Sequence, residues 1–246
     1  MDFEKAMKAF DKYVSSYDMK DKNIIHKYRH TYKVVDLMEE LANRLDLDDE
    51  KIFISKLIGL LHDIGRFEQL KQFSSYNDHA TFDHADMSCC YLFEEGHIRD
   101  FVENDKYDKL IENAVRNHNK KFIALMDDES LFFSKMIRDM DKVDIYRGIA
   151  VDYETKFDAK EVSKDVLELF SKGEIIDRKL VKSESDEVLL DMGFVFDFNF
   201  EESLDILVET DNFDLYLGTV KVSEDSEKLW KKVREICFDK INKGIN

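Results

Sequence analysis

The sequence contains no proline in any of its 246 positions, and only 8 glycines. Proline ends or kinks a helix because it lacks a backbone N–H and its ring clashes with the preceding turn. Without proline, long uninterrupted helices form easily, and stiff proline-rich linkers are excluded. The chain is therefore expected to fold as a series of helices with few sharp breaks.

Apolar residues recur at helical spacing along most of the chain, as expected for helices that bury one face. Residues 24–45 carry such a face. The next helix can be capped by Asp48 or Asp49 and is apolar on nearly all sides, which is typical of a central, buried helix; we expect it to stop near Gly65. The same spacing predicts further helices over residues 83–96, 110–118, 130–147, 161–175 and 223–241.

The C-terminal part of the chain is harder to assign. Phenylalanines alternate in the stretch GFVFDFNFEESL, residues 193–204, which is compatible with a strand. Because the neighbouring segments are helical, we expect a helix there. The fold class predicted is all-α, in one domain over residues 1–246. That domain has a motif-bearing core at about 20–150 and a C-terminal helical extension at about 151–246.

Composition limits the classes of function. A hydrophobic fraction of 43% suits a globular protein, and a net charge of −17 disfavours binding to nucleic acid polymers and anionic membranes. The apolar runs are too short to span a membrane, and the N-terminal segment does not resemble a secretory signal. The three cysteines, Cys89, Cys90 and Cys237, lack metal-binding spacing and are expected to be reduced. We therefore expect a cytoplasmic protein.

Histidines and aspartates at the inner edges of apolar helix faces are the most informative feature. An unpaired polar group there is costly, so these side chains are expected to meet at one interior site. A divalent metal ion is the natural partner for several imidazoles and two carboxylates. The candidate ligands are His30, His62, Asp63, His84, His118 and Asp141.

Four of these residues carry a family resemblance. The order His30, then His62-Asp63 within LLHDIGRF, then Asp141 within RDMDKVD resembles the H…HD…D signature of HD-superfamily phosphohydrolases. The resemblance covers roughly residues 20–150. It implies an HD-domain helical bundle, here with additional C-terminal helices, and a metal-dependent phosphohydrolase activity.

The two intervening histidines extend the resemblance. His84 within FDHADMS and His118 within VRNHNK are similar to the extra ligands of the dinuclear branch, which includes cyclic-nucleotide and HD-GYP phosphodiesterases. The sequence NKKFIALMDD follows His118, without a GYP-type motif. Activity on cyclic dinucleotides is therefore not expected.

The resemblance implies a division of roles. His30, His62, Asp63 and Asp141 would hold a first divalent ion, while Asp63 would bridge to a second ion held by the two further histidines. The ions, one or two of Mn, Fe, Co, Zn or Mg, would activate a water molecule against a phosphate ester of a small molecule, for which we expect a nucleotide. Besides Asp63, the catalytic candidates are Arg66 and Lys142, which could bind the substrate phosphate or be ordinary paired cations.

Two alternative functions remain open. The chain could bind a nucleotide as a regulatory module without turnover, or use di-iron on the same ligand set as an oxygenase. Other histidines are assigned to minor roles: His26 to a position beside the site, His79 to a polar loop and His97 to a helix end. The sequence gives no indication of the oligomeric state.

Overall fold

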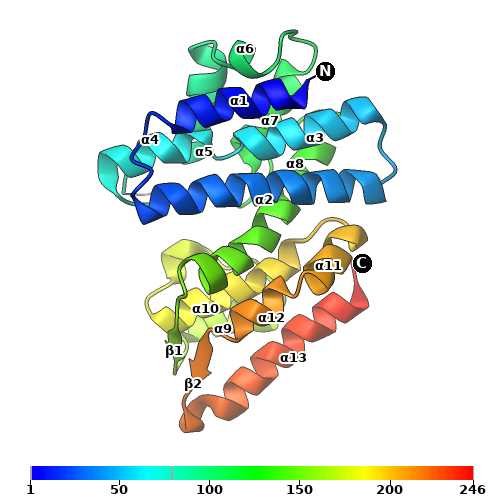
Figure 1. Ribbon diagram of the computed structural model, residues 1–246. Coiled ribbons are helices and arrows are strands. Elements are labelled where there is room, and N and C mark those ends of the chain that lie inside the picture. Colours follow the sequence, from blue (N-terminus) through cyan, green and yellow to red (C-terminus); the bar gives the residue numbers. More distant parts are fainter. Residues whose placement is uncertain (1, 79, 246) are drawn as a thin grey trace. The chain divides into compact units, whose positions relative to one another are not determined.

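The computed structural model describes residues 2–78 and 80–245 (Figure 1). The chain divides into two compact units, residues 1–141 and 142–246, and each is described by itself. The single-domain organisation stays a prediction. His79, expected in a polar loop, lies outside the described residues.

The first unit is built from helices only, in the part of it that the structure describes. Helix α2 packs along α3, while α1 contacts both α3 and α6 (Figure 1). Helices α4, α5 and α7 follow one another in contact, since α4 packs on α5 and α5 on α7. The elements are α1 (Phe3–Val14), α2 (Lys22–Arg44), α3 (Asp49–Leu61), α4 (Ile64–Phe73), α5 (His84–Cys89), a π-helical turn (Cys90–Glu94), α6 (Ile98–Phe101), α7 (Asp108–Asn117) and most of α8 (Asp128–Arg147).

Helix α3 is the central helix of this unit, as its composition predicts. Its residues from Leu57 to Leu61 are all buried. The helix begins where expected, because the Asp48 side chain accepts a hydrogen bond of 2.9 Å from the backbone N–H of Lys51. A helix buried on nearly all sides can carry polar side chains only at its ends, and that is where the metal-binding candidates begin.

The connection between α3 and α4 consists of His62 and Asp63 alone. Gly65 was expected to stop the preceding helix, but α3 ends at Leu61 and Gly65 lies in the first turn of α4. Its role is steric. A Cβ atom at Gly65 would lie 2.5 Å from the backbone oxygen of His84 and 2.7 Å from the backbone nitrogen of Ser88. The glycine therefore allows α4 and α5 to approach closely.

We expect Gly65→Ala to destabilise the first unit by about 1–3 kcal/mol, because backbone atoms of α5 have to move to admit the new methyl group. Urea unfolding followed by far-UV circular dichroism measures the change. Gly193→Ala is a matched control, since a Cβ there meets side chains only at 3.7 Å or more. A loss of the same size in both variants would show that the close approach at Gly65 has no special importance.

The second unit is also mainly helical. It contains the end of α8, α9 (Lys164–Ser171), α10 (Glu184–Met192), α11 (Glu201–Glu209), α12 (Asn212–Leu217), α13 (Glu227–Lys243) and short 3₁₀ and π turns. Two strands of three residues, β1 (Phe157–Ala159) and β2 (Val220–Val222), pair in parallel with Phe157 opposite Val220. These strands were not expected from the sequence, but they are so short that the all-α class is confirmed.

The phenylalanine-rich stretch is partly helical, as preferred from its surroundings. Residues Gly193–Asp197 form a 3₁₀ turn, and α11 begins at Glu201. Between them, Phe198 and Phe200 have extended backbone angles. The alternation of phenylalanines therefore reflects a turn and a short extended link between two helices, not a strand.

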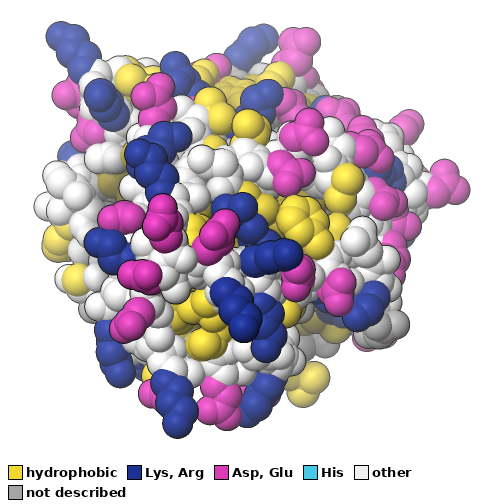
Figure 2. Space-filling model, turned by 90° about the horizontal axis from the view of Figure 1, so that it is seen from below, with side chains coloured by type: hydrophobic (Ala, Val, Ile, Leu, Met, Phe, Trp, Pro, Cys, Tyr) yellow, Lys and Arg dark blue, Asp and Glu magenta, His cyan; other side chains and the backbone are white. Residues whose placement is uncertain are grey.

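The surface mixes charges of both signs. On the face drawn in Figure 2, Lys and Arg side chains lie among Asp and Glu side chains, with small apolar areas between them. The excess of acidic residues is therefore not concentrated into one continuous acidic surface there. Within the described residues, the helices are too short or too polar for any of them to cross a membrane.

Candidate metal centre

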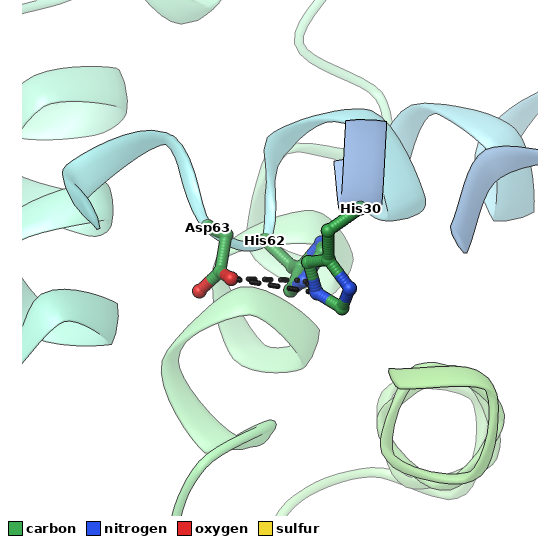
Figure 3. A group of neighbouring side chains, drawn as sticks. All are labelled: His30, His62 and Asp63. Carbon is green, nitrogen blue, oxygen red and sulfur yellow. Dashed lines mark hydrogen bonds and ion pairs between the residues drawn. The ribbon is translucent and has the colours of Figure 1, made fainter. Parts of the chain in front are cut away.

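The six side chains that the sequence singles out as metal ligands lie close together inside residues 1–141. Figure 3 shows three of them: His30 projects from α2, while His62 and Asp63 come from the α3–α4 junction. The other three are His84 at the start of α5, His118 directly after α7 and Asp141 on α8. Five of the six are buried, and Asp141 has 16% of its side chain exposed.

One group of ligand atoms gathers around Asp63 Oδ2. The Nε2 atoms of His30 and His62 lie 3.6 and 3.5 Å from this oxygen and 3.3 Å from each other. Asp141 Oδ1 completes the group, at 3.1 Å from His30 Nε2 and 3.8 Å from His62 Nε2. The two imidazoles thus lie close to carboxylate oxygens of both Asp63 and Asp141.

A second group gathers around the other oxygen of the same carboxylate. His84 Nε2 lies 3.1 Å and His118 Nε2 3.5 Å from Asp63 Oδ1. The two Nε2 atoms are 3.0 Å apart. Asp63 therefore presents one oxygen to each group, which is the arrangement expected of a bridging carboxylate.

Hydrogen bonds to the far side of each ring fix which nitrogen carries the proton. His62 Nδ1 lies 2.8 Å from the carbonyl oxygen of Gly59, and His118 Nδ1 lies 2.7 Å from that of Val115. A carbonyl oxygen only accepts hydrogen bonds, so Nδ1 donates in both residues. In the neutral rings, the lone pairs of Nε2 therefore point toward the centre, as metal ligation requires.

His84 is oriented by Asp78, a residue that the sequence reasoning missed. Its Nδ1 donates to Asp78 Oδ2 at 2.8 Å. Asp78 is itself held by Arg66 at 2.7 Å and by the Gln69 amide at 2.9 Å. Such a carboxylate–histidine pair fixes the ring and raises its basicity as a ligand. Asp78 lies in an irregular loop, where no periodicity marks it.

The protonation states suit cation binding. Burial alone would raise the pKa of the Asp63 carboxyl, but Lys27 and the neighbouring imidazoles outweigh it and hold that pKa well below its ordinary value. Burial likewise opposes ionisation of Asp141, yet His30 lowers the pKa of that carboxyl. Burial lowers the pKa of His118 to about 4, so this ring is neutral near pH 7 and its lone pair is available.

The residues present fit a bound metal ion on two counts. Neighbouring ligands about 2.1 Å from one ion lie roughly 3.0–3.4 Å from each other, close to the separations in both groups. In addition, Asp63 Oδ1 is buried and has no hydrogen-bond partner among the described residues. Arg66 Nε lies 3.7 Å from this oxygen, beyond hydrogen-bond distance, so a metal ion could supply the closer positive charge that a buried carboxylate oxygen requires.

The two cations predicted to bind substrate phosphate both have protein partners, and Arg66 Nε lies 3.7 Å from Asp63 Oδ1. Arg66 donates to Gln69 Oε1 at 2.6 Å and to the Tyr76 carbonyl at 2.9 Å, in addition to its pairing with Asp78. Lys142 pairs with Asp197 at 2.6 Å, within the second unit. Their catalytic roles stay predictions. What the structure shows for Arg66 is that it holds the loop that carries Asp78.

A second residue that sequence reasoning missed positions His118. Arg138 is buried, and its guanidinium donates to the backbone carbonyls of Asn117, His118 and Lys120 at the end of α7. Cations bind well to these terminal carbonyls because the last turn of a helix leaves them without partners inside the helix. The only sequence signal for this role is an arginine one helical turn before Asp141.

The remaining histidine and cysteine assignments agree with minor roles. The His26 ring lies beside His30, with ring centroids 6.0 Å apart. His97 pairs with Asp100 and is exposed. Burial raises the pKa of the Cys89 thiol to about 12, so it is a poor nucleophile near neutral pH.

Comparison with protein families identifies the first unit. Residues 28–146 match the family model of the HD domain, a range that includes all six clustered residues. This part of the chain is an HD domain. Neither the curated proteins nor the solved structures that were searched contain a match to it. HD domains bind divalent metals and belong to a family consisting mostly of metal-dependent phosphohydrolases, and the clustered His and Asp side chains of this chain could hold such a metal.

Proposed function

We propose that this HD-domain protein is a metal-dependent phosphohydrolase that cleaves a phosphate ester of a small molecule, with a nucleotide as the favoured substrate class. The observation that supports this most is the position of Asp63, whose Oδ2 faces His30 and His62 and whose Oδ1 faces His84 and His118. When bound, divalent ions would supply the Lewis acidity that activates water and neutralises phosphate oxygens.

The chain's own residues would hold and orient this centre. His30, His62 and Asp141 would bind one ion, His84 and His118 the other, and Asp63 both. The hydrogen bonds of His62 and His118 to backbone carbonyls keep their rings in the metal-binding tautomer. Because the donors are fixed by buried helix ends, little reorganisation is needed when substrate arrives.

The test is phosphate release by the purified protein from a panel of nucleotides and simple phosphate esters, after loading with Mn²⁺ and after chelation. We expect turnover that requires metal and that falls by at least three orders of magnitude in Asp63→Asn. Asp36→Asn, at an exposed position on α2, controls for a loss of activity that any change of an aspartate to asparagine would cause. Tight nucleotide binding without turnover at any metal loading would instead identify a binding module. Oxygen consumption by iron-loaded protein without phosphate release would identify an oxygenase.

A further inference from the structure

A lysine lies against the carboxylate on which the metal centre is built. Lys27 precedes His30 by one helical turn on α2, and its ammonium nitrogen lies 2.6 Å from Asp63 Oδ2. Both side chains are withdrawn from solvent, with 12% of Lys27 and 3% of Asp63 exposed. The ammonium also faces the ring of Tyr76, 5.6 Å from its centroid. Lys27 is therefore a contact of the centre and not a surface cation.

The contact makes the two oxygens of Asp63 unequal. Oδ2 already has a cationic partner in Lys27 and also faces His30 and His62. Oδ1 faces His84 and His118 and has no hydrogen-bond partner among the residues described; its cationic neighbour, Arg66, keeps Nε 3.7 Å away, against 2.6 Å for Lys27 at Oδ2. A carboxylate oxygen can accept a hydrogen bond and bind a metal ion at the same time. If Lys27 and a metal ion shared Oδ2, two positive charges would lie beside one oxygen atom.

We propose that Lys27 is a counter-cation for Asp63 that holds this carboxylate in place in the metal-free protein and lowers the affinity of the adjacent position for divalent ions. Positive charges a few ångströms apart repel strongly in a poorly solvated interior. Without a metal, the Lys27 ammonium offsets the negative charge of the Asp63 carboxylate, which is buried near a second carboxylate, that of Asp141. The proposal rests on metal binding at this centre and does not require that the protein hydrolyse phosphate esters.

The charge of Lys27 therefore has opposite effects on two measurable quantities. Removing it should strengthen metal binding and weaken the metal-free fold. A lysine with a merely structural role would affect both in the same direction, because a disturbed site both binds metal less well and unfolds more easily. The sign of the change in affinity thus separates the two roles.

The experiment compares the parent protein with Lys27→Met and Lys27→Gln. Mn²⁺ affinity is measured by equilibrium dialysis with metal analysis, and the stability of the chelated protein by thermal unfolding. We expect both variants to bind Mn²⁺ at least tenfold more tightly and both metal-free forms to unfold at a lower temperature. Glutamine keeps a hydrogen-bond donor without the charge, so it should lose less stability than methionine.

Lys33→Met is the matched control, because Lys33 lies on the same helix with 58% of its side chain exposed. It should leave affinity and stability unchanged. Unchanged or weaker Mn²⁺ binding in folded Lys27→Gln would overturn the proposal, as would a parent protein that binds no Mn²⁺. A parent protein that binds Mn²⁺ and shows the expected tightening, but releases no phosphate from any substrate, would contradict only the proposed hydrolase.

Discussion

Replacing Asp63 with asparagine is expected to abolish binding at both metal positions, whereas replacing His118 with alanine should abolish binding at only one. Asp63 offers one oxygen to each pair of imidazoles, while His118 Nε2 lies 3.5 Å from Oδ1, on the side of His84. Asparagine keeps the shape of the side chain and can still accept a hydrogen bond from Lys27, so the loss reports the missing charge. Loss of one ligand from a metal site typically weakens binding by far more than the 10–100-fold seen when an outer partner is removed.

Metal analysis of the dialysed proteins measures this difference. The parent should hold roughly two ions per chain, His118→Ala about one, and Asp63→Asn close to none, as inferred from the two ligand groups. Equal stoichiometry in His118→Ala and the parent would show that the centre is mononuclear and that His118 has another role. Asp63→Asn that retained the parent's metal content would contradict the bridging role.

The stability of the second unit is expected to fall as pH rises from about 4 to 7, by about 4 kcal/mol in total. The group responsible is Asp191 on α10, which is buried and accepts a hydrogen bond of 3.2 Å from the Tyr216 hydroxyl. Burial, assisted by the charge of Glu187, raises the pKa of the Asp191 carboxyl to about 7. Its ordinary value in an unfolded chain is about 3.9.

The direction follows from proton binding. Below about pH 4 the carboxyl is protonated in both the folded and unfolded states. Between about pH 4 and pH 7 the folded protein keeps the proton that the unfolded chain has lost, so each unit of rising pH lowers the free energy of unfolding. Above about pH 7 the whole penalty is present.

Asp191→Asn is expected to remove this pH dependence and to be more stable than the parent at pH 8. Denaturant unfolding followed by the fluorescence of Trp230 measures it, because Trp230 is the single tryptophan and is buried within the second unit. Asp205→Asn, an exposed position on α11, is the control and should behave like the parent. Equal slopes of stability against pH in Asp191→Asn and the parent would count against the assignment.

The parts of the site that were predictable share one property: each ligand interrupts an apolar pattern. His62 and Asp63 follow the most apolar helix, and His118 continues the apolar face of α7. Polar residues in such buried positions require a bonding partner, and the order of these residues along the chain matches the HD signature. The pattern therefore indicated both the helical class and the set of residues that cluster.

The parts that were not predictable depend on contacts between distant segments. Asp78 lies in a loop and is held there by hydrogen bonds from Arg66 and Gln69, and no local pattern marks it. From the sequence, Gly65 is expected to end a helix, but in the structure it allows close packing against α5. Lys27 lies one turn from His30 on the same helix, so its proximity was available from spacing, but its pairing with Asp63 required the fold.

The wide separation of the ligands along the chain has a consequence for folding as well as for chemistry. His30 and His62 are 32 residues apart in the chain, and His84 and His118 are 34 apart. An ion held by such pairs would close long loops, as a disulfide does, and would stabilise the folded state by a free energy that rises with the logarithm of its affinity. All six ligands belong to residues 1–141, so this cross-linking would act on the first unit alone. Metal supply would then bear directly on the stability of residues 1–141, which carry every ligand.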